Sequence, residues 1–322
     1  MTAYAPIERV RSRGAAADRI FNLVTIGAAW VVLFVLLGAA VSMAWGGRLA
    51  FQTFGFFHFI VSKDWDAVNG QFGALVPIYG TLVTSTIAII IAVPVSIGIA
   101  LFLTEIAPRW SRGPIGIAIE LLAAIPSIIY GMWGLFVFAP FMAAHVEPWL
   151  NDHLGQWPVI GPLFTGPPIG IGMLTAGIVL GIMIIPFIAA VARDVFSAVP
   201  PPLKESAVAL GSTRWEVLTK VTLPYTRSAM IGAIFLGLGR ALGETMAVTF
   251  VLGNAHDFSG SLLMPSNSIA AALANEFTEA DTDLYRSSLI ALAFLLFIVT
   301  VIVLGFAKLL LLRLQKAHGR TL

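Results

Sequence analysis

The chain has 322 residues, of which 58% are hydrophobic and only 11% are charged. An ordinary soluble protein has roughly 45–50% apolar residues, glycine included, and about 25% charged residues. Nineteen basic and 17 acidic residues cannot cover a soluble surface at this length, which argues against a soluble enzyme, a disordered protein and a basic nucleic-acid-binding protein. The absence of cysteine excludes disulfides, thiolate metal sites and a cysteine nucleophile. The composition therefore predicts an all-α polytopic membrane protein.

Six stretches have the length of a membrane-spanning helix, about 20 apolar residues for ~30 Å of hydrocarbon. The first follows a basic leader, but it exceeds the roughly 7–15 apolar residues of a signal peptide, so we expect it to be retained. Pro94, Pro126 and Pro186 lie inside predicted spans, where each is expected to kink its helix. The predicted spans are 20–45, 74–103, 115–142, 169–192, 228–253 and 284–312, between an N-terminal tail (1–19) and a C-terminal tail (313–322).

The distribution of lysine and arginine predicts the orientation of these spans, because such residues concentrate in cytoplasmic segments. Fifteen of the 19 lie in the two tails or the even-numbered loops, three lie on the opposite side, and Arg240 falls inside a span. Both tails and the loop 193–227 are therefore expected in the cytoplasm. The bases of the tails are Arg9, Arg11, Arg13, Arg19, Lys308, Arg313, Lys316 and Arg320.

Charged side chains inside the membrane are costly, so each is a candidate functional residue. Arg240 lies near the middle of the fifth predicted span, with Glu244 four residues later, one turn along the same helix. A guanidinium suits a tetrahedral oxyanion, which predicts a translocation site for an anion. The alternative is a self-neutralising pair that only allows the helix to pack. Glu120, near the inner end of the third span, is interpreted as a side chain that either extends to the membrane interface or makes a local helix–helix hydrogen bond.

Polar residues in two other spans are candidates for lining the same path. Thr84 lies in the second span, and Ser127 follows Pro126 in the third. The alternative for both is a hydrogen bond to the backbone of their own helix, as is common for serine and threonine in membranes.

The loop 193–227 predicts two short helices at the membrane surface. Leu203–Ala209 forms the first, and Gly211 is a suitable residue to end it. Thr213 and Glu216 have the spacing of a capping box that begins the second, which we expect Pro224 to end. The pair predicts a docking surface for a cytoplasmic partner; an amphipathic loop lying on lipid is the alternative.

The spacing within this loop resembles the EAA loop of ABC importer permeases. The pattern is Glu-x-Ala, a glycine four residues later, and an ending similar to Ile-x-Leu-Pro. Glu205, Ala207, Gly211, Leu223 and Pro224 match it, with Val221 in the place of isoleucine. The resemblance implies a type I ABC importer permease fold, and it implies that these five residues couple the chain to an ATPase subunit.

Further motifs are similar to the PstC family of phosphate importer permeases, although the sister PstA family shares several of them. The resemblance extends from about Asp18 to the end of the chain and implies that Arg240 and Glu244 take part in phosphate translocation. The matching runs are Gly80–Thr86, Ala124–Ser127, Gly237–Val248 and Asn275–Phe277.

The resemblance implies a non-catalytic permease subunit in the bacterial cytoplasmic membrane, without cofactor or metal of its own. Its implied partners are a PstA-like sister permease, a PstB-like ATPase dimer that binds ATP, and a PstS-like extracytoplasmic phosphate-binding protein. The chain contains no G-x-x-x-x-G-K-[ST] phosphate-binding loop, so ATP hydrolysis is expected from the partner. A permease for sulfate or molybdate is the alternative; a secondary transporter would leave the EAA-like loop unexplained.

Overall fold

The computed structural model describes residues 15–318, and the outer parts of both predicted tails, with Arg9, Arg11, Arg13 and Arg320, lie outside the described residues. The regular elements of the described residues are all helices, and the only β-pairing among these residues consists of isolated bridges. Six helical stretches are long and apolar enough to cross a membrane: Asp18–Gly46, Leu75–Ile106, Ser127–His153, Met173–Ser197, Arg214–Leu242 and Asp283–Arg313.

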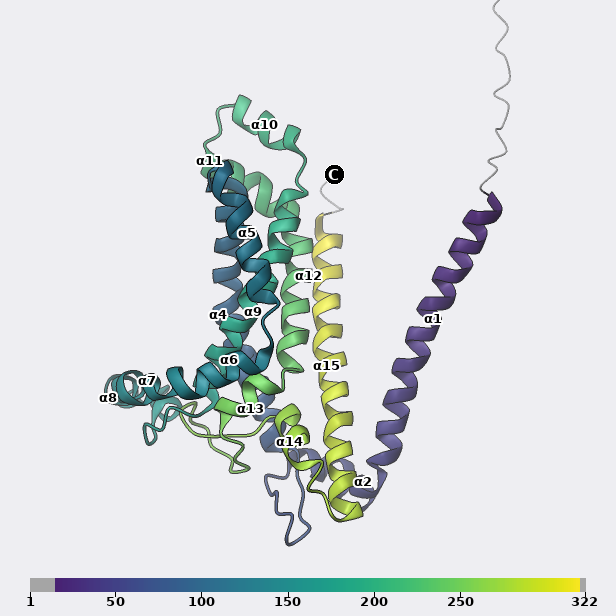
Figure 1. Cartoon of the computed structure of the whole chain (residues 1–322), viewed down its shortest axis with the longest axis vertical. Helices are drawn as coiled ribbons and strands as arrows, with labels where there is room; N and C mark the ends of the chain where they lie inside the picture. Colours follow the sequence, from purple (N-terminus) through teal and green to yellow (C-terminus); the bar gives the residue numbers. More distant parts are fainter. Residues whose placement is uncertain (1–14, 319–322) are drawn as a thin grey trace, which may run out of the picture.

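The long helices run roughly along one direction, except that α1 leans away from the others, and the short helices gather at the two ends of the bundle (Figure 1). The long helices are α1 (Ala15–Gly46), α4 (Leu75–Leu101), α5 (Arg109–Ala123), α9 (Met173–Ser197), α12 (Leu223–Leu242) and α15 (Asp283–His318). At one end lie α10 (Pro201–Ala209) and α11 (Arg214–Val217), and near the other lie α2 (Arg48–Phe54), α3 (Phe56–Val61), α13 (Met246–Leu252) and α14 (Ile269–Glu276).

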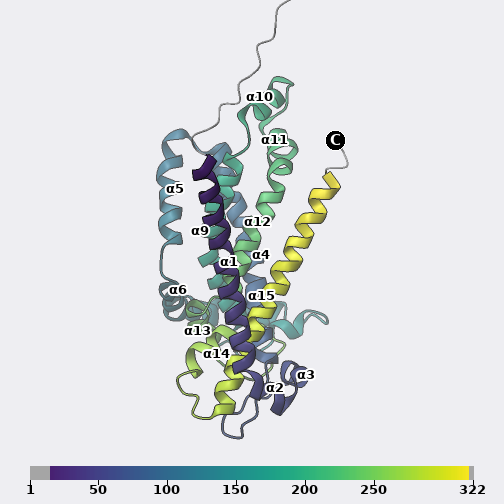
Figure 2. The same cartoon turned by 90° about the vertical axis from the view of Figure 1, so that its right-hand side faces the viewer.

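The described ends of the chain lie on the same side of the molecule as α10. Both the start of α1 and the end of α15 point toward the end of the bundle that carries α10 and α11 (Figures 1 and 2). This arrangement agrees with the expectation that both tails and the loop 193–227 share one side of the membrane.

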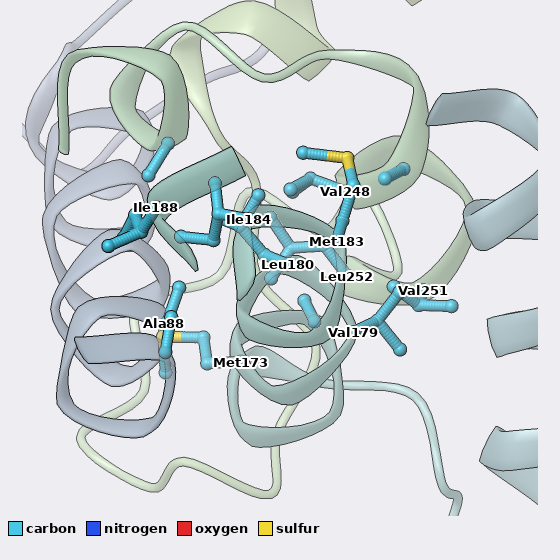
Figure 3. Close-up of a cluster of buried hydrophobic side chains, with 14 residues drawn as sticks. Ala88, Met173, Val179, Leu180, Met183, Ile184, Ile188, Val248, Val251 and Leu252 are labelled. Atoms are coloured by element: carbon cyan, nitrogen blue, oxygen red, sulfur yellow. The ribbon is translucent and has the colours of Figure 1, made fainter. Parts of the chain in front are cut away.

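The hydrophobic core is built around α9, whose most apolar window is 61% buried. Side chains of α9 such as Leu180 and Ile184 meet Val248 and Leu252 of α13 and Ala88 of α4 (Figure 3). Small residues make this packing close: a Cβ on Gly177 would lie 2.6 Å from the Cβ of Ile87. Glycine at this position therefore allows α4 and α9 to approach each other.

The third predicted span, 115–142, differs most from the structure. Helix α5 ends at Ala123, the chain is non-helical around Pro126, and a new helical stretch begins at Ser127. This stretch runs sideways from the bundle through α6 (Ser127–Trp133), α7 (Ala139–Phe141) and α8 (Glu147–His153), which are joined by π-helical turns (Figure 1). Pro126 was expected to kink one helix, but it separates two, because a proline disfavours helical geometry in the residue before it.

The fifth predicted span, 228–253, is wrong at both ends. The helix already begins at Arg214, because α11 continues through the π-helical turn Leu218–Thr222 into α12. Pro224 lies in the first turn of α12, so the expected break there does not occur. The wider π-helical turn accommodates the proline ring and the backbone carbonyl that this ring leaves without a donor. The real break comes later, after Leu242.

Candidate functional site

A break in the fifth helical span separates the two main candidate translocation residues, because Arg240 lies in the last turn of one helix and Glu244 in the connection after it. Helix α12 ends at Leu242, and α13 begins at Met246, so Gly243 to Thr245 connect two separate helices. The expected i, i+4 relation between Arg240 and Glu244 is therefore wrong, because Glu244 no longer belongs to the helix of Arg240. Non-helical backbone at membrane depth is tolerated where protein buries it or where it lines a water-filled cavity.

Arg240 is exposed on the described chain, in the last turn of α12. Its guanidinium carbon lies 5.8 Å from the ring centroid of Phe187 on α9, near the outer limit of a cation–π contact. No ion pair joins Arg240 to Glu244 within the described residues. A permanently charged side chain to which the described part of the chain offers no carboxylate partner is suited to an anion.

Glu244 lies two residues before the start of the next helix and forms no ion pair with Arg240. Its Oε1 accepts a hydrogen bond from the backbone N–H of Ala247 at 3.4 Å, in the first turn of α13. The carboxylate therefore has a capping role that sequence spacing did not indicate. Gly237 explains how α12 approaches the core, since a Cβ there would lie 2.6 Å from Ile188 on α9.

Thr84 and Ser127, the other two translocation candidates, have different surroundings. Thr84 is buried on α4, and its hydroxyl donates to the backbone oxygen of Gly80 at 2.7 Å, the alternative considered for it. Ser127 is half-buried and is the first residue of α6. Both helix breaks lie at the same end of the long helices, and α6 packs on α13 there (Figure 1). The structure thus joins the segments that follow the two breaks.

The EAA-like residues lie at the opposite end of the molecule, on α10 and the turn after it. Glu205 and Ala207 are on α10, and Gly211 has φ +88° in the following turn. Backbone hydrogen bonds from Gly211 to Val208 and from Ser212 to Ala207 form a Schellman motif, as the position of this glycine predicted. Helix α11 begins with the predicted capping box of Thr213 and Glu216.

A groove of about 590 Å³ separates α10 from α11 and carries both apolar and charged side chains. Glu205, Trp215 and Val208 line it, together with Lys204, whose Nζ lies 2.5 Å from Glu105 Oε1. Trp215 is 70% exposed, which makes it a prominent unpartnered aromatic residue on this surface. Leu223 and Pro224 are in the first turn of α12 and do not line the groove; Leu223 packs against a buried cluster that includes Phe196 of α9 and Met230 of α12.

A polar cluster at the other end was missed from the sequence. Glu276 Oε1 lies 2.7 Å from His256 Nε2, and its Oε2 accepts from Trp65 Nε1 and Tyr285 Oη, both at 2.8 Å. Burial raises the pKa of Glu276, but the hydrogen bonds from His256, Tyr285 and Trp65 outweigh it and hold that pKa below its ordinary value. The one feature of the sequence that could have indicated this cluster was Glu276 itself, which lies in the Asn275–Phe277 run noted above.

A second missed feature is the ion pair between Glu120 and Arg193. Arg193 Nη2 lies 2.7 Å from Glu120 Oε1, which joins α5 to the end of α9. The expected helix–helix contact of Glu120 is thus confirmed. Its partner was not identified, because the two residues are 73 positions apart and no sequence pattern connects them.

Comparison with known proteins finds relatives of this chain over most of its length. Residues 92–316 match the family described as binding-protein-dependent transport system inner membrane component. The phosphate transport system permease protein PstC of Xylella fastidiosa (strain Temecula1) is 61% identical over 307 residues, which cover 95% of this chain and 94% of that protein. The PstC of Pasteurella multocida is 57% identical over 291 residues, 90% of each chain.

Solved structures share the fold at low sequence identity. A crystal structure of a bacterial alginate ABC transporter with an alginate-bound periplasmic protein aligns with a TM-score of 0.58 and 18% identity, over 92% of this chain and 95% of that one. The MetNI methionine ABC transporter, in an inward-facing form, aligns with a TM-score of 0.53 over 77% of this chain and 95% of that one. The fold is that of a type I ABC importer permease, and the chain belongs to the family of binding-protein-dependent transport system inner membrane components.

Proposed function

We propose that this chain is one of two permease subunits of an ATP-driven importer of inorganic phosphate. The observation that carries the proposal is Arg240, an arginine without a carboxylate partner in the described chain, next to a break in a membrane-spanning helix. The high identity with permeases named for phosphate transport supports the choice of substrate. A permease for another oxyanion would have the same chemistry at Arg240, but no comparison favours it.

The proposed path passes the break between α12 and α13. Phosphate entering low-dielectric protein loses hydration worth several kcal/mol even after relaxation, and a guanidinium offsets part of that cost. Gly243 begins the connecting segment and is exposed, and a Cβ there would meet only the backbone oxygen of Gly239, at 3.8 Å. Thr84 and Ser127 remain candidates for this path; the hydroxyl of Thr84 is already used as a donor within α4.

We assign coupling to α10 and the groove beside it. The groove surface of Glu205 and Trp215 is suited to a cytoplasmic ATPase, and Gly211 sets the turn after α10. Ala207 on α10 and Leu223 and Pro224 at the start of α12 are proposed to act in coupling because they match the EAA pattern. The chain itself is proposed to be non-catalytic and without cofactor, with ATP bound by a PstB-like dimer. A PstA-like sister permease completes the path, and a PstS-like binding protein delivers phosphate on the outer side.

The proposed location is the bacterial cytoplasmic membrane with both tails inside. A reporter fused after Asp152 should report the outer side, and one after Ser212 the cytoplasmic side. The opposite result for either fusion contradicts the orientation.

The decisive experiment measures radiolabelled phosphate uptake beside membrane abundance, in cells that lack other phosphate transporters. Arg240→Gln should abolish uptake with normal assembly, and Arg240→Lys should keep part of it, because the charge remains and the planar fork is lost. The double variant Arg240→Gln with Glu244→Gln should stay inactive. Uptake restored in the double variant would show that the two residues act only as a structural pair.

A further inference from the structure

A cationic cavity lies at the end of the bundle that carries α10, away from the helix break and next to the coupling groove, with which it shares Lys204. Its volume is about 350 Å³, and four segments line it: the end of the α4 span, α5, the end of α9, and α10. Three of its seven lining residues are cations, namely Arg112, Arg193 and Lys204, and none is acidic. A cavity whose charged lining is entirely basic is suited to an anion.

Two of these cations, Arg193 and Lys204, are fixed in position by carboxylates that lie outside the cavity. Arg193 bonds to Glu120 at 2.7 Å and to Asp194 at 3.4 Å, and Lys204 bonds to Glu105 at 2.5 Å. The side chains of Arg193 and Lys204 are only 27% and 25% exposed. Each contact occupies some of the donors of its cation, since a guanidinium has five and an ammonium three. The side chains therefore arrive at the cavity already ordered, with N–H groups still available.

Arg112 differs from the other two because no carboxylate compensates it within the described chain. Its Nε donates to the backbone oxygen of Ala107 at 2.7 Å, which fixes the plane of the guanidinium and leaves the charge unpaired. Gly116, one turn along α5, gives space to Arg193, since a Cβ there would lie 2.7 Å from Arg193 Nη1. Two guanidinium groups thus reach one cavity from α5 and α9.

The start of α5, which lines the cavity, carries a side chain typical of the membrane–water interface. Trp110, two residues before Arg112, is 81% exposed at the start of α5, as is typical of a tryptophan at the membrane–water interface. Basic pockets between membrane helices on the cytoplasmic side bind phospholipid head groups. On the proposed orientation, this cavity opens at the cytoplasmic leaflet.

We propose that this cavity binds a phosphate group, either the phosphodiester of an anionic phospholipid or inorganic phosphate on the cytoplasmic side. Two arginine forks and an ammonium supply the charge-assisted hydrogen bonds that phosphate oxygens accept. Because Lys204 immediately precedes the coupling residue Glu205 on α10, the bound group would hold α10 against α5 and α9. This proposal rests on the proposed function in one respect, the assignment of the cavity to the cytoplasmic side of the membrane.

The test measures binding to the purified, assembled transporter, so it is independent of whether phosphate is transported. One arm counts phosphatidylglycerol molecules retained after exchange into detergent, by native mass spectrometry. The other arm measures binding of radiolabelled inorganic phosphate to lipid-free complex without the binding protein. Arg112→Gln is compared with Arg109→Gln, a matched control on the same helix turn whose side chain is exposed and does not line the cavity.

Arg112→Gln should bind roughly tenfold more weakly than Arg109→Gln in one arm, as expected for the loss of hydrogen bonds to a charged group. A difference in the first arm identifies a lipid, and a difference in the second identifies free phosphate. Equal binding by the two variants in both arms overturns the proposal. If Arg112→Gln does not assemble, Arg112→Lys is compared with Arg109→Lys, and equal binding by that pair overturns it as well.

Discussion

Helices α1 and α9 have the same hydropathy and opposite surroundings. The most apolar window of each has a mean hydropathy of 2.5, yet 61% of that window is buried in α9 and none of it in α1. Helix α1 leans away from the bundle and approaches it only near α2 and the start of α15 (Figure 1). Hydropathy therefore identifies a membrane helix but does not show whether protein or lipid covers it.

Small residues distinguish the two helices where hydropathy does not. Gly177 and Gly181 of α9 face α4 at close range, with Ile87 and Ala88 as their neighbours. A Cβ on Gly27 or Gly38 of α1 would meet nothing within 4 Å. Close packing through small residues is how membrane helices associate without a hydrophobic driving force, so α9 forms the centre of the fold.

The largest expected effect comes from adding a side chain where α4 and α9 touch. Gly177→Leu should remove most of the folded protein from the membrane, because the added atoms would overlap the Cβ of Ile87. Gly27→Leu is the matched control on α1 and should leave the abundance and thermal stability of the chain unchanged. Size-exclusion profiles after heating measure both, and equal loss from the two variants would contradict the comparison.

A smaller effect is expected from truncating a core side chain. Ile184→Ala should destabilise the chain by about 2–5 kcal/mol, because Ile184 is fully buried among α9, α13 and α4 (Figure 3). Leu36→Ala on α1 removes a side chain that is 50% exposed and should change stability by less than about 0.5 kcal/mol. Unfolding in mixed micelles gives the two values. A loss for Leu36→Ala as large as for Ile184→Ala would show that α1 is packed in the isolated chain.

The smallest expected effect concerns a polar side chain, Glu276, that is largely covered by protein, in contrast to the apolar side chains of α9. The pKa of Glu276 is held below its ordinary value of 4.5, so its interactions stabilise the fold above pH 4.5, and this contribution is lost as the pH falls through the lowered value. Glu276→Gln should lower the melting temperature at neutral pH. Below pH 4.5, the melting temperature of this variant should fall less steeply with decreasing pH than that of the wild type. Glu279→Gln, an exposed neighbour, should keep the wild-type profile. Identical pH profiles for Glu276→Gln and wild type would contradict the assignment.

Several features were predictable because their causes are local in sequence. The apolar stretches, the Schellman glycine at 211 and the capping box at Thr213 each depend on residues within a few positions. The break after Leu242 was not predicted, because Gly243 and its neighbours are also compatible with a continuous apolar helix. The cluster around Glu276 joins residues from Trp65 to Tyr285, and only tertiary packing brings them together.

The role of proline also depended on its context. Pro94 and Pro186 lie inside continuous helices, Pro126 separates two helices, and Pro224 begins one after a π-helical turn. Sequence position alone predicted a kink for the first three and a break for the fourth. Neighbouring helices and the backbone geometry before each proline decide among these outcomes.

The central claim is that the segment between α12 and α13 faces a water-filled path, and thiol accessibility tests it most directly. The chain has no cysteine, so a single introduced thiol is the only one this subunit offers. A charged, membrane-impermeant reagent, followed by the mass of the subunit, should modify Gly243→Cys in the assembled transporter, with a rate that changes when phosphate and ATP are added. Leu242→Cys, at a position only 2% exposed, should remain unmodified. Lack of modification of Gly243→Cys in every state, while Gly211→Cys on the exposed turn reacts, would contradict the proposed path.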